Sequence, residues 1–107
     1  MFAEYLKEKT DDQIIETEKG FVTYCFTNES DCYIKDVYIL PQFRNMGAMT
    51  EFGDQITLTA KAANKKRLLG SVIPSNKNST ASMKALFAYG MKIDSATNDF
   101  ILLSKEI

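Results

Sequence analysis

The chain has 107 residues, of which 45% are hydrophobic and 11% aromatic, and its net charge is −1. This length and composition predict one folded domain over residues 1–107 with a hydrophobic core, and they exclude a disordered tail. The near-neutral charge gives no basic face of the kind that nucleic-acid binding requires. The basic stretch at 61–67 is interpreted as a solvated helix end, where cations are favourable.

The sequence contains no histidine, the commonest general base and zinc ligand. Serine–histidine and cysteine–histidine nucleophiles are therefore excluded. Cys25 and Cys32 lack metal-ligand spacing, so we expect no metal site. The charged start "MFAEYLKEKTDDQ" is unlike a signal peptide, and no apolar run reaches membrane-spanning length. These features predict a cytoplasmic protein with free thiols and no membrane partner.

The first half of the chain predicts a β-hairpin followed by a helix. A short helix over 2–8 and a brief strand around 14–15 come first. Residues 21–26 and 32–40 are rich in β-branched and aromatic side chains on either side of a turn, which is typical of a hairpin. Apolar residues at helical spacing then predict a helix from about residue 46 to about residue 64.

The second half predicts a strand over 67–73, a helix that stops at Gly90, and two final strands at 91–93 and 100–104. The strand–helix–strand portion at 33–73 needs a crossover connection, which implies a parallel strand pair inside a mixed sheet. The expected fold class is α/β (α+β), with helices on the sheet faces.

The stretch "LPQFRNMGAM" at 40–49 carries the main candidate site. Pro41 stops the strand, and the following helix exposes unpaired N–H groups and the positive end of its dipole. Gly47 allows close approach to the backbone, and Arg44 adds a cation. Two interpretations stay open, a phosphate or pyrophosphate site and a tight turn alone. The Walker-type loop and the dinucleotide glycine pattern are both missing.

The segment "VYILPQFRNMGAM" resembles the acetyl-CoA signature of the GNAT superfamily of N-acetyltransferases. In that signature a strand ending in Val-x-Pro is followed by Arg or Gln, two residues, Gly, one residue, and Gly or Ala. Arg44 and Gly47 fill their positions, whereas Met49 replaces the final small residue. The strand, loop and helix that end at Gly90-Met91 are similar to the family's next motif, which ends in Gly-Phe. The resemblance covers about residues 20–105, with a shortened N-terminal part.

The resemblance implies a mostly antiparallel sheet with a central parallel strand pair and helices on both faces. It also implies acetyl-CoA as co-substrate, lying where the strand ending at Leu40 diverges from the strand ending at Ile73. An amine on a small molecule or a protein would attack the thioester directly. The alternatives are a GNAT-fold protein that has lost catalysis and acts as a binding or structural module, and an unrelated α/β binding domain. Family members often pair through their last strands, so a homodimer is a further expectation.

Two side chains are candidates for catalysis. Without histidine, the general base is expected to be a carboxylate, and Asp36 lies on the strand that would border the gap. Leu86 occupies the position of the family's tyrosine acid, which leaves Tyr89 as a candidate general acid. The rival interpretations are an exposed strand charge for Asp36 and core packing for Tyr89.

The resemblance also assigns a set of coenzyme-binding residues. Asn78 either bonds the pantetheine amide or caps the second helix, and both interpretations stay open. The full set is Tyr38, Ile39, Leu40, Arg44, Asn45, Met46, Gly47, Ala48, Met49, Thr50, Asn78 and Ser82.

Overall fold

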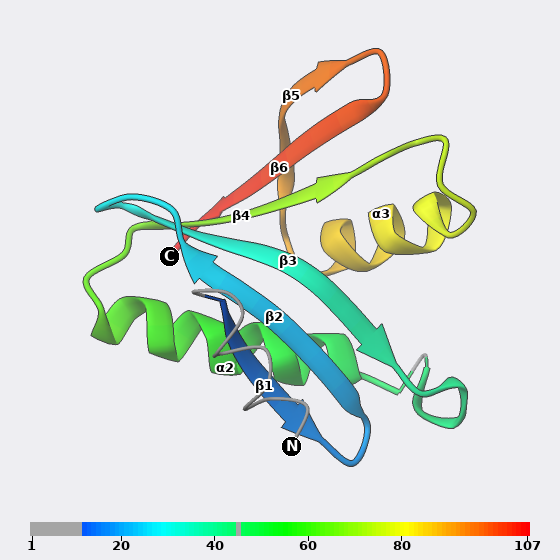
Figure 1. Cartoon of the computed structure of the whole chain (residues 1–107), viewed down its shortest axis with the longest axis horizontal. Coiled ribbons are helices and arrows are strands. Elements are labelled where there is room, and N and C mark those ends of the chain that lie inside the picture. The colour runs from blue at the N-terminus through cyan, green and yellow to red at the C-terminus, as the bar shows by residue number, and fades with distance from the viewer. Residues whose placement is uncertain (1–11, 45) are drawn as a thin grey trace.

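The computed structural model describes residues 12–44 and 46–107, so Asn45 and the helix predicted over 2–8 lie outside the description. The described residues form one six-stranded sheet in the order β1-β2-β3-β4-β6-β5, with two α-helices (Figure 1). In chain order the elements are β1 Gln13–Thr17, β2 Gly20–Phe26, β3 Asp31–Ile39, the 3-10 turn η1 Pro41–Phe43, α2 Ala48–Ala62, β4 Arg67–Val72, α3 Ser79–Ala88, β5 Lys92–Thr97 and β6 Phe100–Glu106.

The sheet is mixed and mostly antiparallel, as the sequence predicts. β3 and β4 are its parallel pair, and α2 is the crossover that joins them. The other neighbouring strands pair antiparallel, including the predicted β2–β3 hairpin. This arrangement places the carboxyl ends of the two central strands on the same side as the start of α2 (Figure 1).

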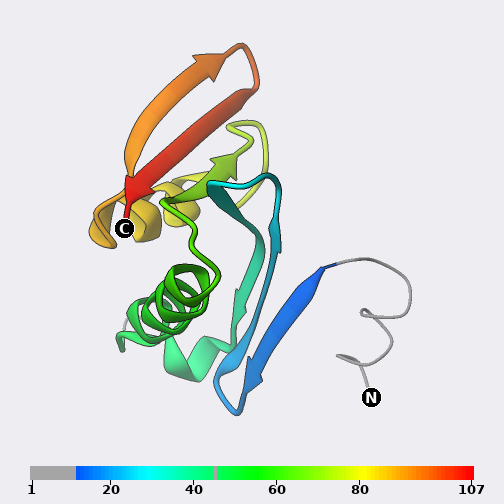
Figure 2. The same ribbon diagram turned by 90° about the vertical axis from the view of Figure 1, so that its left-hand side faces the viewer.

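Both described helices pack on the same face of the sheet (Figure 2). Phe52 and Ile56 of α2 share one core with Leu86 of α3 and with the strand residues Cys32 and Leu68. We call this side of the sheet the helix face and the opposite side the second face. The resemblance predicts helices on both faces of the sheet. Besides α2 and α3, the sequence predicts one further helix, over 2–8, and these residues are not among those that the structure describes.

β3 and β4 separate before either strand ends. Their pairing stops at Ile34 and Gly70, after which β3 continues beside β2 and β4 continues beside β6. The β2–β3 register shifts at this point, because Tyr24 opposes Ile34 while Thr23 opposes Asp36, which leaves Lys35 as an extra residue in β3. Such a bulge bends a strand and increases its twist. We call the diverging segments, 35–39 of β3 and 71–72 of β4, the β3–β4 fork (Figure 1).

Candidate functional site

The first turn of α2 presents backbone N–H groups that precede the helical hydrogen-bond ladder. The first bond of the ladder runs from Glu51 N–H to Gly47 O at 3.1 Å. The N–H groups of Ala48, Met49 and Thr50 therefore have no carbonyl one turn behind them in the helix. Together with the helix dipole they form a site that favours an anion.

Gly47 is the N-cap residue of α2 and adopts a left-handed conformation, with φ of 81°. A Cβ atom at this position would meet no heavy atom within 4 Å, so the space directly beside Gly47 is open. Met49, the departure from the family signature, turns its side chain towards the core and packs there as a partly buried residue. The Met49 side chain therefore occupies space partly within the core, whereas the side chain of Met46 is exposed.

Arg44 is held against the end of β3. Its Nε donates to the carbonyl of Ile39 at 2.9 Å, and its guanidinium carbon lies 5.9 Å from the centre of the Tyr38 ring. That ring also stacks on Phe21, with the ring centroids 5.9 Å apart. A cation stacked on an aromatic face loses little freedom when it binds an anion.

Lys19 and Glu51 also belong to this region, although sequence reasoning did not identify them. Lys19 Nζ donates to both carboxylate oxygens of Glu51, at 3.0 and 3.1 Å. The pair places one positive and one negative side chain beside the first turn of α2. No local pattern could have revealed it, because the two residues are 32 positions apart.

Along the end of β3, every second residue directs its backbone N–H and C=O groups towards the fork. Leu40 N–H donates to Lys19 O at 2.8 Å, so Leu40 faces the β2 side. Antiparallel ladders alternate, and Tyr38 therefore also faces β2, while Val37 and Ile39 direct their N–H and C=O groups away from it. Of the three predicted backbone contacts, Ile39 faces the fork, and Val37, which was not predicted, joins it.

Asp36 lies on the second face, directly opposite Thr23 of β2. Thr23 Oγ1 donates to Asp36 Oδ2 at 3.3 Å, and Asp36 N–H donates to Thr23 Oγ1 at 3.1 Å. The Asp36 side chain is exposed and lies next to the bulge that starts the fork. The structure thus keeps this candidate base at the fork with one hydroxyl partner.

Tyr89 is buried between α3 and α2. Its hydroxyl donates to Asp54 Oδ1 at 3.0 Å and lies 3.0 Å from Thr57 Oγ1. Burial is the main reason that the pKa of Tyr89 is raised; the bond to Thr57 opposes this increase, and Asp54 adds to it. The ring fills the space above Gly53, where a Cβ would be 2.5 Å from Tyr89 Cζ. These contacts connect the two helices through the candidate acid.

The first turn of α3 holds the other predicted contacts. Asn78 is its N-cap residue, but its side chain makes no capping hydrogen bond. Asn78 and Ser82 are both exposed, and Leu86, at the family's tyrosine position, is buried in the core. A depression of about 370 Å³ borders the start of α3 and the end of β4; its lining is Val72, Pro74, Ser79, Thr80, Met83, Lys84, Phe87 and Ile101.

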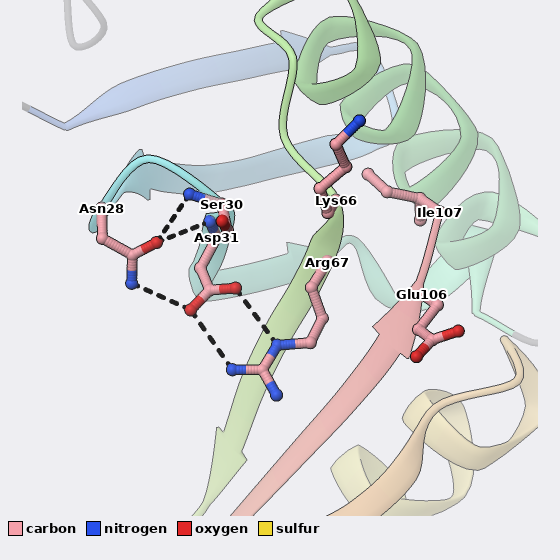
Figure 3. A pocket seen from close by; sticks show the side chains of 7 residues that line it. All are labelled: Asn28, Ser30, Asp31, Lys66, Arg67, Glu106 and Ile107. Atoms are coloured by element: carbon pink, nitrogen blue, oxygen red, sulfur yellow. Dashed lines mark hydrogen bonds and ion pairs between the residues drawn. The ribbon is translucent and has the colours of Figure 1, made fainter.

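A larger depression, of about 590 Å³, lies at the opposite end of the central strands (Figure 3). Its central carboxylate, Asp31, is bonded by Arg67 Nε at 3.1 Å and by Asn28 Nδ2 at 2.9 Å. The bond from Arg67, followed by the bond from Asn28, holds the pKa of Asp31 below its ordinary value. Because Asp31 and Arg67 pair with each other and the depression lies away from the fork, we do not assign the coenzyme to this depression.

Cys25 and Cys32 are free, and burial raises the pKa of the Cys32 thiol to about 11, which keeps it protonated at neutral pH. No cluster of three or more potential metal-ligating side chains occurs in residues 12–44 and 46–107. Neither described helix has the length and apolar character that crossing a membrane requires.

No protein-family profile and no curated protein matches the sequence. Solved structures do match the fold. A GNAT family acetyltransferase from Elizabethkingia anophelis with acetyl-CoA bound has a TM-score of 0.77 and 19% identity, over 97% of this chain and 82% of that one. The PaiA N-acetyltransferase from Thermoplasma acidophilum in complex with coenzyme A has a TM-score of 0.78 and 10% identity, over 97% of this chain and 66% of that one. An IAA acetyltransferase from Bacillus cereus has a TM-score of 0.75 and 15% identity, over 99% of this chain and 83% of that one.

These structures show that the chain has the GNAT fold, as the sequence resemblance predicts. The fold is a divergent example, since none of these three structures exceeds 19% identity.

Proposed function

We propose that the protein is an acyltransferase that moves an acetyl group from acetyl-CoA to a primary amine. The observation that carries the proposal is the position of the β3–β4 fork beside the open first turn of α2. One element can bind a thioester arm along a strand edge, and the other can bind a diphosphate. Acetyl-CoA carries both groups.

We assign the diphosphate to the N–H groups of residues 48–50, with Gly47 allowing close approach and Arg44 supplying a cation. We assign the pantetheine arm to the fork-facing backbone of Val37 and Ile39. Strand edges bind extended ligands through such N–H and C=O groups. The C=O of Ile39 already accepts a hydrogen bond from Arg44 Nε, so Ile39 offers its N–H and Val37 offers both groups. Asn78 and Ser82 are exposed at the start of α3 and extend the same surface.

The amine attacks the thioester carbon directly, with no covalent intermediate on the protein. Holding both reactants in line and stabilising the developing oxyanion are then the main contributions of the fold. The attacking nitrogen must be uncharged, and Asp36 is the carboxylate at the fork that can accept its proton. Two matching structures hold acetyl-CoA or coenzyme A, which supports this choice of acyl donor.

The rival is a GNAT-fold protein that binds without catalysing. Buried Leu86 at the tyrosine position and the engagement of Tyr89 with Asp54 favour this rival. A binder and an enzyme both take up acetyl-CoA, but only the enzyme releases the free thiol of coenzyme A when an amine is present.

The test is a thermal-shift titration with acetyl-CoA, followed by thiol release with a panel of amines that includes a polyamine, an aminoglycoside and a lysine-containing peptide. Acetyl-CoA should raise the melting temperature by mass action. Gly47→Glu should abolish the shift, because it adds bulk and negative charge at the diphosphate. Asn64→Glu is the matched control, since Asn64 also has positive φ (63°) but lies beyond the other end of α2. No shift for the wild type, or an unchanged shift for Gly47→Glu, contradicts the proposal.

A further inference from the structure

A hydrogen bond joins two hydroxyl groups at the base of the β3–β4 fork. The Tyr33 hydroxyl and Ser71 Oγ bond to each other although the residues are 38 positions apart. The last β3–β4 pair is Ile34 with Gly70, so Tyr33 comes one residue before this pair and Ser71 one residue after it. The bond therefore spans the point at which the strands separate.

Both hydroxyl groups lie on the second face. Their neighbours Ile34 and Val72 point into the core on the helix face, and side chains alternate along a strand. Tyr33 is fixed opposite Cys25 of β2, and Ser71 is fixed opposite Leu102 of β6. Both side chains are partly buried and mounted on paired strands, which is the rigid support that a reacting group needs.

The two faces of the fork offer separate approaches. The first turns of α2 and α3 lie on the helix face, where the coenzyme is assigned. On the second face, the fork carries exposed Asp36 and Tyr38, the latter 43% exposed, so solvent reaches it. A ternary complex needs two reactants at one carbon, and approach from opposite faces lets the amine reach the thioester without displacing the coenzyme.

We propose that the Tyr33–Ser71 hydroxyl pair receives the acceptor amine on the second face and relays its proton to the departing sulfur. This inference rests on the proposed acetyl transfer. The nitrogen forms a bond to the carbonyl carbon, and the carbon–sulfur bond breaks with its electron pair left on sulfur. The nitrogen's proton passes to Ser71 Oγ, the serine proton to the Tyr33 oxygen, and the phenol proton to the thiolate.

Asp36 removes the first proton, from the ammonium form of the amine, and the relay carries the second, which the nitrogen loses after attack. The relay returns both hydroxyl groups to their starting state. A hydroxyl group can donate and accept at the same time, which allows the transfer through a bonded pair. The phenol is the more acidic of the two and therefore takes the step to sulfur. In this scheme the pair takes the role of the tyrosine acid that Leu86 displaces, and Asp36 keeps the role of the base that a histidine would otherwise fill.

Tyr33→Phe and Ser71→Ala test the relay in the intact protein. Each should lower kcat at least about 100-fold, the usual size of an acid–base contribution, while the acetyl-CoA thermal shift and the KM for acetyl-CoA stay at wild-type values. Ser71→Thr keeps a hydroxyl group and should recover activity. Tyr24→Phe, whose ring lies in the core, and Ser104→Ala, on β6 of the second face, are matched controls that should keep wild-type kcat.

Two outcomes overturn the inference alone. If the wild type transfers acetyl groups and both variants keep kcat within a few-fold, the pair is structural. The same conclusion follows if Ser71→Thr is as slow as Ser71→Ala although its melting temperature is normal. A wild type that transfers to none of the amines removes the proposed function and this inference together, and the acetyl-CoA thermal shift then tells whether coenzyme binding survives.

Discussion

Lys19 Nζ lies 3.0 Å from Glu51 Oε2, which connects the β1–β2 turn to the first turn of α2. The backbone carbonyl of Lys19 also accepts the N–H of Leu40 at 2.8 Å. One residue therefore links the end of β3 to the start of α2, the two elements that we assign to the coenzyme. Its charge partner places a carboxylate close to the proposed diphosphate.

Removing the Glu51 charge should strengthen coenzyme binding. Glu51→Gln should lower the Kd for acetyl-CoA roughly two- to fivefold, the effect of one unit charge acting through solvent over several ångströms. Lys19→Met should raise the Kd by a similar factor, because it leaves the carboxylate unpaired. Calorimetric titration at low and high salt measures both, and both effects should shrink as salt screens them. Equal Kd values for Glu51→Gln and wild type at low salt would place the diphosphate elsewhere.

Gly47→Ala should destabilise the free protein through its backbone alone. The left-handed φ of 81° costs an alanine about 1–2 kcal/mol, while its Cβ meets no atom within 4 Å. Gly47→Asn should lose less of the free energy of unfolding, because asparagine tolerates this conformation better. Urea denaturation compares the two, and a larger loss for asparagine than for alanine would show that the conformational argument is wrong.

Tyr89→Phe distinguishes a catalytic phenol from a structural one. We expect a loss of about 1 kcal/mol in the free energy of unfolding, from the hydroxyl bonds to Asp54 and Thr57. The kcat for acetyl transfer should change by no more than a few-fold. A 100-fold drop in kcat with unchanged stability would instead identify Tyr89 as the general acid.

Gly53→Ala should disturb the same contact from the other side. The added Cβ would lie 2.5 Å from Tyr89 Cζ, so the ring must move, and overpacking of this kind costs about 1–3 kcal/mol. In the Tyr89→Leu background the alanine should cost less, because the ring is gone. Chemical denaturation of the two single variants and the double variant gives the coupling, and additive losses would mean that the residues do not contact each other in solution.

Asp31→Asn should change how stability depends on pH. The lowered pKa of Asp31 means that the folded state favours the carboxylate. Its contribution to the free energy of unfolding is therefore complete above the ordinary value near 4 and is lost as pH falls through the lower folded value. At pH 7 we expect the variant to be less stable by about 1 kcal/mol. Thermal unfolding between pH 2 and about 7 measures this, and a constant difference across the range would argue against the linkage.

The order of elements was predictable because each carries its own local signal. The apolar residues of 48–60 recur at helical spacing, and the strands β2, β3, β4 and β6 are rich in β-branched, aromatic or other apolar residues. β5 is the exception: the sequence predicted a strand only over 91–93, whereas β5 covers Lys92–Thr97, whose residues are all exposed. The bulge that begins the fork interrupts the alternation of core-facing residues along β3. Positions 32 and 34 lie in the core, but the next residue packed against it is Ile39, and the interruption lies beside Asp36.

Long-range side-chain pairs were not predictable. Lys19 with Glu51 and Tyr33 with Ser71 join residues that are 32 and 38 positions apart, and nothing in the sequence near either member marks its partner. Tyr89 was a candidate because it lies one helical turn after Leu86, the family's tyrosine position, and the structure adds that its hydroxyl bonds to α2. The alternation of backbone groups, which adds Val37, depends on the β2–β3 register and could not be read from residue types.

The most direct test of the account is a crystal structure of the protein with coenzyme A. We predict that the diphosphate lies within hydrogen-bonding distance of the N–H groups of residues 48–50 and that the pantetheine arm pairs with the backbone of Val37 and Ile39. A coenzyme bound elsewhere, with β3 and β4 paired along the whole of the fork, would contradict the central claim.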